Sequence, residues 1–301
     1  MKESVFQHPV TDGDVQIAAS IRETIGPGKV SIGPDTRAIF DEIMEHTPIA
    51  EGVTFVEETV GDVPGWWAFP LETRDATQVI LYLHGGAFLA GSAKAYRGLA
   101  GQIAVRANAP TFIADYRLAP ENPYPAAIDD AFAAFTWLAE KGYSKIALAG
   151  DSAGGGLVFA LASKVGSKAV GVLGLSPWTD LALESPSMVD RADADPYLTK
   201  KNLSDAANSY LGSIDPKAPL ASPLYGEFAG SPPVLIHVGE DEILLDDSRR
   251  IHEKITAAGG KSELHVWECM PHVFPSNVGT FAASSEALEI IGSFLREVLA
   301  S

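Results

Sequence analysis

The sequence predicts an α/β fold, with a mostly parallel sheet of eight strands flanked by helices and covered by a helical cap. After about residue 50, short apolar runs alternate with longer amphipathic stretches, the pattern of strands and helices in such a sheet. Runs such as Val79–Leu83 are apolar on both faces, as central strands covered by helices must be. A length of 301 residues suits one large domain, so we expect residues 1–301 to form a single unit.

Eight segments have the composition and length of strands. The first two flank the turn-rich stretch Gly61–Pro64, which predicts an antiparallel hairpin. The expected strands are Val53–Val60, Gly65–Pro70, Val79–Leu83, Thr111–Ala114, Lys145–Ala149, Val170–Leu175, Val234–Val238 and Glu263–Glu268.

Helices are expected between these strands, and one of them, Ala153–Val165, is apolar nearly all round and should be buried. Two regions fall outside the alternation: about residues 1–50, and residues 178–216, a polar insertion between two core strands. Ligands of α/β sheets bind outside the carboxyl ends of the strands, where such an insertion can cover a pocket. We therefore expect these two regions to form the cap. The expected helices are Ala93–Ala107, Ala126–Glu140, Ala153–Val165, Asp246–Ala258 and Phe281–Leu299.

The charge balance excludes several classes of protein. The chain has 22 Lys and Arg against 39 Asp and Glu, a formal charge of −17, which repels nucleic-acid phosphates and anionic membranes. Its single cysteine, Cys269, cannot form an internal disulfide or a zinc site of several thiolates. The first residues have no apolar signal segment, and no run approaches the ~18 apolar residues that span a bilayer. We expect a cytoplasmic protein.

The most informative motif is Gly150-Asp151-Ser152-Ala153-Gly154, which matches G-x-S-x-G between an apolar strand and an apolar helix. A nucleophilic serine held in such a sharp turn needs small neighbours two positions away, and the helix that follows directs its amino end at developing negative charge. Ser152 is therefore the expected nucleophile. The alternative is a glycine-rich helix start without chemistry.

A second motif, His84-Gly85-Gly86-Ala87-Phe88, directly follows the strand Val79–Leu83. Attack on an ester carbonyl creates an oxyanion that needs preorganised N–H donors, and glycine backbone lets such donors approach closely. We expect the amides of Gly85, Gly86 and Ala153 to form this oxyanion hole. The alternative is a tight turn, with His84 serving to organise the loop.

A serine nucleophile needs a general base and an orienting carboxylate. Of seven histidines, only His272 lies in a loop just past the last expected strand, at the carboxyl edge of the sheet. Acidic residues crowd the loop after Val234–Val238; the later ones precede a helix, and Glu240 and Glu242 suit a solvent-facing loop. We predict Asp241 as the triad acid, with Glu240 as the alternative.

These motifs resemble those of the hormone-sensitive-lipase group of bacterial carboxylesterases, in the α/β-hydrolase superfamily. Four stretches carry the resemblance: residues 84–88, residues 115–121 (Asp-Tyr-Arg-Leu-Ala-Pro-Glu), residues 150–155, and Asp241 followed by residues 271–274. The resemblance implies the same triad and oxyanion donors. It departs at Ala87, where the family has a third glycine, and this affects the expected shape of the acyl pocket.

The expected function is hydrolysis of short- to medium-chain carboxylic esters by Ser152, His272 and Asp241 through an acyl-enzyme. No metal or organic cofactor is implied, the partners are a small-molecule ester and water, and Phe88 and Tyr197 are candidate pocket walls. The alternatives are a lactonase, an amidase or a deacetylase on the same triad, or a ligand-binding receptor without catalysis. A homodimer that pairs through the strand Glu263–Glu268 is a further expectation.

Overall fold

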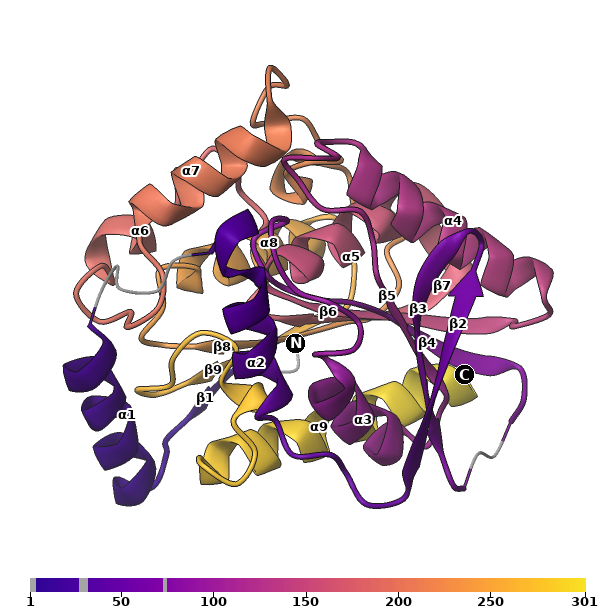
Figure 1. The fold of residues 1–301 in the computed structure, drawn as a ribbon, viewed down its shortest axis with the longest axis horizontal. Helices are drawn as coiled ribbons and strands as arrows, with labels where there is room; N and C mark the ends of the chain where they lie inside the picture. Colours follow the sequence, from indigo (N-terminus) through magenta and orange to yellow (C-terminus); the bar gives the residue numbers. More distant parts are fainter. Residues whose placement is uncertain (1–3, 27–31, 73–74) are drawn as a thin grey trace.

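The computed structural model describes residues 4–26, 32–72 and 75–301, and it contains one sheet of nine strands in the order β1-β9-β8-β7-β6-β4-β5-β3-β2 (Figure 1). The α/β fold and the mostly parallel sheet are confirmed, whereas the predicted number of eight strands was wrong. The strands are β1 (Val5–His8), β2 (Val53–Val60), β3 (Val63–Pro70), β4 (Gln78–Leu83), β5 (Thr111–Ala114), β6 (Lys145–Asp151), β7 (Ala169–Leu175), β8 (Val234–Gly239) and β9 (Ser262–Trp267).

The ninth strand is β1, which pairs in parallel with β9. Its four residues alternate between exposed and partly buried positions and form no apolar run, so no strand was predicted there. β9 is therefore hydrogen-bonded on both sides, to β8 and to β1, and it offers no free edge for the expected dimer. The antiparallel hairpin of β2 and β3 is present as predicted, and β3 also runs antiparallel to β5.

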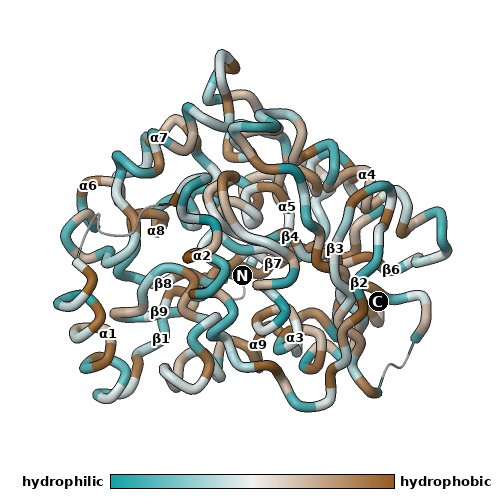
Figure 2. The backbone as a smooth tube through the Cα atoms, in the orientation of Figure 1, coloured by the Kyte–Doolittle hydropathy of each residue, from teal (hydrophilic) through white to brown (hydrophobic). Residues whose placement is uncertain are grey.

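Helices cover both faces of the sheet (Figure 1). One face packs against α3 (Arg97–Ala107) and α9 (Ala282–Ala300), and the other against α4 (Ala126–Glu140), α5 (Ser152–Val165) and α8 (Leu245–Ala257). Hydrophobic residues gather along the central strands, with hydrophilic residues more frequent at the periphery (Figure 2). The buried helix expected at residues 153–165 is α5, which is buried at nearly every position because it packs against β4, β6 and β7.

The region expected to form the first half of the cap has two parts. β1 and α1 (Asp12–Ile25) lie at the edge of the sheet, where Asp14 accepts hydrogen bonds from the amides of Ala282 and Ala283 at the start of α9. β1 thus belongs to the sheet and not to a helical cap. α2 (Arg37–Glu45) lies beside α3. Residues 1–3 and 27–31 of this region lie outside the described residues.

The second expected cap region contains α6 (Ser187–Asp190) and α7 (Lys200–Leu211), which lie on the side of the sheet that α5 covers (Figure 1). Short 3-10 turns occur at Pro34–Thr36, Gly166–Lys168, Pro223–Tyr225 and Phe274–Ser276. Among the residues that the structure describes, no helix has both the length and the apolar character needed to cross a membrane.

Candidate active site

Ser152 lies at a sharp turn between β6 and α5, as its motif predicts. Its φ of 52° falls in the left-handed region, which a residue with a side chain rarely adopts, and its side chain is nearly buried. The turn packs closely on the end of β4, because a Cβ at Gly154 would stand 2.0 Å from the carbonyl oxygen of Leu83. The small residues of the motif therefore let a strained serine sit against the neighbouring strand.

His272 lies in the loop after β9, and its Nε2 is 2.9 Å from Ser152 Oγ. The two residues are 120 positions apart in the sequence. They meet because both follow strands of the parallel sheet and so lie at the same edge of it. The structure thus places the predicted nucleophile and the predicted base in one hydrogen bond.

The carboxylate that contacts His272 belongs to Glu242, whose Oε2 is 2.7 Å from His272 Nδ1. The prediction of Asp241 for this position was wrong: its Oδ2 instead accepts a hydrogen bond from Arg22 of α1, at 2.6 Å. The alternative, Glu240, is also turned away and lies 3.6 Å from Arg191 in an ion pair.

Glu242 is fully buried and its second oxygen is also bonded. Oε1 accepts hydrogen bonds from the amide of Gly239, at 2.6 Å, and from Ser176 Oγ, at 2.8 Å. The hydroxyl of Ser176 in turn accepts from the amide of Val273, next to His272. The carboxylate of Glu242 thus also closes its own turn, because Gly239 lies only three residues earlier in the chain.

One feature of the sequence could have indicated Glu242. It is followed directly by the apolar run Ile243-Leu244-Leu245, all of it buried, whereas Glu240 and Asp241 precede that run. Because Ile and Leu are the residue types most often buried, the acid directly next to this run is the one closest to the interior.

The charge around His272 favours its protonated form. Burial alone would lower the pKa of His272, but the hydrogen bond and charge of Glu242, together with the charges of Asp195 and Asp151, raise the pKa above its usual value. An imidazolium that forms when His272 takes the serine proton is thereby stabilised.

The loop after β4 differs from the prediction at Gly85. The amide of Gly85 donates a hydrogen bond to Asp151 Oδ1, at 3.0 Å, so it is not free to bind an oxyanion. Gly85 is glycine because a Cβ there would stand 2.3 Å from the Asp151 carboxylate. In the described part of the chain, the amides of Gly86 and Ala87 donate no hydrogen bond, and Ala153 lies in the first turn of α5, where amides lack helical partners.

Asp151 joins the nucleophile turn to this loop. Besides Gly85, it accepts hydrogen bonds from the hydroxyls of Tyr82, at 2.8 Å, and Tyr96, at 3.0 Å. Burial raises the pKa of Asp151 to about 6, although these donors oppose the shift. His84 has the loop-organising position expected for it, with Nδ1 2.7 Å from the Gly85 carbonyl oxygen.

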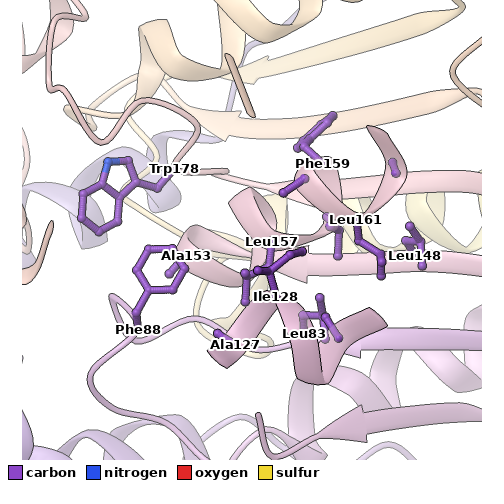
Figure 3. Packing of buried hydrophobic residues seen from close by; sticks show 14 of the residues in the cluster. Leu83, Phe88, Ala127, Ile128, Leu148, Ala153, Leu157, Phe159, Leu161 and Trp178 are labelled. Carbon is purple, nitrogen blue, oxygen red and sulfur yellow. The ribbon is translucent and has the colours of Figure 1, made fainter. Parts of the chain in front are cut away.

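The two predicted pocket walls differ in burial. Phe88 is buried and stacks on Tyr210 with ring centroids 3.9 Å apart, and its ring also packs against that of Trp178 (Figure 3). Tyr197 is partly buried and packs against the same hydrophobic core. That either residue contacts substrate stays a prediction.

A left-handed serine at a strand-to-helix turn, bonded to a histidine that a buried glutamate orients, defines the α/β-hydrolase class when it stands on a mostly parallel sheet. A family model described as the alpha/beta hydrolase fold matches residues 80–276. The chain belongs to this family.

Relatives agree with this assignment. An acetyl-hydrolase of Streptomyces hygroscopicus is 36% identical over 244 residues, covering 79% of this chain and 81% of the relative. The esterase LipI of Mycobacterium tuberculosis is 32% identical over 297 residues, covering 86% of this chain and 92% of the relative. A crystal structure of an esterase from the bacterial hormone-sensitive lipase family has a TM-score of 0.88 and 36% identity, covering 96% of this chain and 99% of that one. The resemblance to this group, predicted from the motifs, is confirmed.

Proposed function

We propose that this protein hydrolyses short- to medium-chain carboxylic esters with Ser152 as nucleophile, His272 as general base and Glu242 as orienting acid. The observation that carries the proposal is the unbroken series of hydrogen bonds from Ser152 Oγ through His272 to Glu242, at 2.9 and 2.7 Å. The general class, a carboxylic ester hydrolase, is confirmed by relatives that are named esterases, carboxylesterases and acetyl-hydrolases.

In the proposed reaction, Ser152 Oγ attacks the ester carbonyl carbon while its proton passes to His272 Nε2. The carbonyl oxygen becomes an oxyanion, which the amides of Gly86, Ala87 and Ala153 are proposed to bind. The bond to the alcohol oxygen then breaks, and the alcohol leaves with the proton from His272. Water then attacks the carbonyl carbon of the acyl-serine while His272 takes one of its protons. The bond between that carbon and Ser152 Oγ breaks, Oγ takes the proton back from His272, and the carboxylic acid leaves.

The proposed substrates carry short acyl groups. Relatives are named acetyl-hydrolases, and a similar structure, 34% identical, was soaked with p-nitrophenyl butyrate. The rings of Trp178 and Tyr210 pack on that of Phe88, and the amide of Trp178 donates to the carbonyl oxygen of Ser152 at 2.9 Å, so bulky side chains lie close to the nucleophile and favour a small acyl group over a long one. A cap formed by residues 178–216 and by those of about residues 1–50 that lie outside β1, a cytoplasmic location and a homodimer stay predictions.

The test is hydrolysis of p-nitrophenyl acetate and butyrate by the wild type and by Ser152→Ala. We expect the variant to lose activity by a factor of about 10³ or more. A fluorophosphonate probe should label the wild type and not the variant. Ser163→Ala, on the same helix with its hydroxyl bonded to the carbonyl of Ala160, is the matched control and should keep both activity and labelling.

Undiminished ester hydrolysis by Ser152→Ala would contradict the proposed mechanism. The same assay with lactones and p-nitroanilides separates the alternatives that use this triad. Faster turnover of either class than of the esters would move the assignment to a lactonase or an amidase.

A further inference from the structure

A buried carboxylate outside the triad supports the loop that carries Glu242. Asp195 lies in the segment between α6 and α7 and is fully buried. Its Oδ1 accepts hydrogen bonds from the amides of Tyr197 and Leu198, both at 2.8 Å, and its Oδ2 accepts one from the amide of Ile243, at 2.9 Å. All three donors are backbone groups, so the carboxylate ties two separate pieces of main chain together.

The hydrogen bond from Ile243 to Asp195 matters because of where Ile243 lies in the chain. Ile243 follows Glu242 directly, so Asp195 holds the peptide on one side of the triad acid. Gly239 and Ser176 hold the acid's carboxylate itself. The backbone and the side chain of Glu242 are therefore fixed from different elements, and only the backbone contact comes from the insertion between β7 and β8.

The charge of Asp195 is not neutralised by a neighbouring cation. In the described ranges, no Lys or Arg lies within ion-pair distance of it, and Arg191 of the same segment pairs with Glu240 instead. The titratable groups that face Asp195 are His272 and Tyr197. Burial raises the pKa of Asp195 to about 6, and the charge of His272 opposes this shift. Above that pH the carboxylate is ionised.

We propose that Asp195 is a positioning residue for ester hydrolysis: it fixes the main chain beside Glu242 and adds a further negative charge to the surroundings of His272. The proposal rests on the proposed function, because it assigns Glu242 and His272 their roles. It means that residues 178–216, which the sequence predicts to be part of the cap, also help to position the triad.

The pH dependence follows from the groups around His272. Three carboxylates act on it: Glu242 from the loop after β8, Asp151 from the end of β6, and Asp195 from the insertion. Each raises the pKa of His272 when ionised. Removing the charge of Asp195 should therefore let His272 lose its proton at lower pH, with Glu242 and Asp151 still in place.

The test compares Asp195→Asn with the matched control Asp246→Asn. Asp246 also connects the insertion to the region after β8, because its Oδ2 accepts a hydrogen bond from the amide of Ser187 at 2.9 Å. It is not among the charges that act on His272. For Asp195→Asn we expect kcat/KM for p-nitrophenyl butyrate to fall about 10- to 100-fold at pH 8, as for lost supporting contacts in other sites. The acidic limb of kcat/KM should move to lower pH, and so should the NMR titration midpoint of the His272 ring.

Asp246→Asn should leave the acidic limb and the His272 midpoint where the wild type has them. The proposal is overturned if Asp195→Asn leaves both unmoved, or if Asp246→Asn moves them as far. Because the NMR titration does not need turnover, it reports on Asp195 even if the Ser152→Ala assay contradicts the proposed function.

A second variant keeps the test open if Asp195→Asn does not fold. Asp195→Glu retains the charge but displaces the acceptor oxygens. We expect its His272 midpoint to stay close to that of the wild type while kcat/KM falls. A midpoint shifted to lower pH in Asp195→Glu would also contradict the proposed role of the charge.

Discussion

The two loops that flank Ser152 are held in place by different means. On the acid side, the loop after β8 is held by buried carboxylates: Glu242, Asp195 and Asp247 accept hydrogen bonds from backbone amides and hydroxyls. On the oxyanion side, the loop after β4 also donates hydrogen bonds to carboxylates, from Gly85 to Asp151 and from Ala93 to Asp115, but it depends in addition on close backbone packing at glycines. Cβ atoms at Gly86 and Gly154 would meet carbonyl oxygens at 2.1 and 2.0 Å.

This difference predicts which changes each side tolerates. A hydrogen-bonded carboxylate depends on charge and acceptor geometry, so the acid side should respond to isosteric changes from acid to amide. A close backbone contact depends on the absence of atoms, so the oxyanion side should respond to a single added methyl group. Asp151 is a fully buried carboxylate on the oxyanion side, so it tests whether that side also depends on a hydrogen-bonded acid.

The largest effect is expected from Glu242→Gln. The amide is isosteric but presents an N–H group to one of its partners, so His272 loses the acceptor that orients it and stabilises its charge. We expect kcat/KM to fall by a factor of about 10³ to 10⁴, the scale known for the corresponding change in a serine protease triad. Steady-state hydrolysis of p-nitrophenyl butyrate measures it.

Asp241→Asn is the control for this change, one residue away in the same loop. It removes the ion pair with Arg22, which is partly exposed and should contribute no more than about 1 kcal/mol to stability. Its kcat/KM should stay within a few-fold of wild type. A greater loss in Asp241→Asn than in Glu242→Gln would restore Asp241 as the triad acid.

On the oxyanion side, Gly154→Ala should destabilise the fold. The added Cβ would stand 2.0 Å from the carbonyl oxygen of Leu83 and 2.4 Å from that of His84, and neither backbone group can move away cheaply. We expect the free energy of unfolding to fall by about 3 kcal/mol, measured by urea denaturation. Gly13→Ala is the control, because its Cβ meets only Thr11 Oγ1 at 3.6 Å and alanine favours a helix. If both variants were equally stable, the close backbone contact at Gly154 would not be what excludes a side chain there.

Tyr82→Phe tests whether Asp151 belongs with the carboxylates of the acid side. The change removes the hydroxyl that donates to Asp151 at 2.8 Å and leaves one buried oxygen with fewer donors. We expect a loss of about 1–3 kcal/mol in unfolding free energy. The pKa of Asp151 should rise further, because that hydrogen bond lowers it. A loss no larger than that of Tyr143→Phe, at a partly buried tyrosine, would show that the hydroxyl contributes little.

The sequence predicts the sheet well because its central strands are continuous apolar runs. β4, β6 and β8 begin or end within two residues of the expected positions. β1 could not be found in this way, because its stability comes from pairing with β9, more than 250 residues later, and from ring stacking of His8 on Trp267. Such long-range partners leave no periodic pattern in the four residues of the strand.

Within the site, Ser152 and His272 were predictable because each stands at a turn directly after a strand. The acid was not predicted, because three consecutive acidic residues compete and the apolar run directly after Glu242 is a weaker signal than a motif. Gly85 was misassigned for a similar reason. Its amide is taken by Asp151, a contact between two loops that neither motif shows by itself.

Asp247→Asn acts on the pH dependence of stability, and it tests whether all carboxylates of the acid side act through their charge. Asp247 Oδ2 accepts from the amides of Thr179 and Asp180, and Oδ1 accepts from Ser185, so an asparagine can keep the first two bonds and donate to the hydroxyl of Ser185. Burial raises the pKa of Asp247 to about 7, above its ordinary value near 3.8. The folded protein therefore holds a proton that the unfolded chain releases between these values.

The sign of the pH effect follows from this proton. The stability that Asp247 contributes is fully present below pH 3.8 and is lost as the pH rises through about 7. Asp247→Asn carries no such titration, so its unfolding free energy relative to wild type should increase between pH 4 and pH 8. Urea denaturation of both proteins across this range measures the difference. A constant difference would mean that Asp247 is ionised throughout, and that the acid side depends on its charge as it does on that of Glu242.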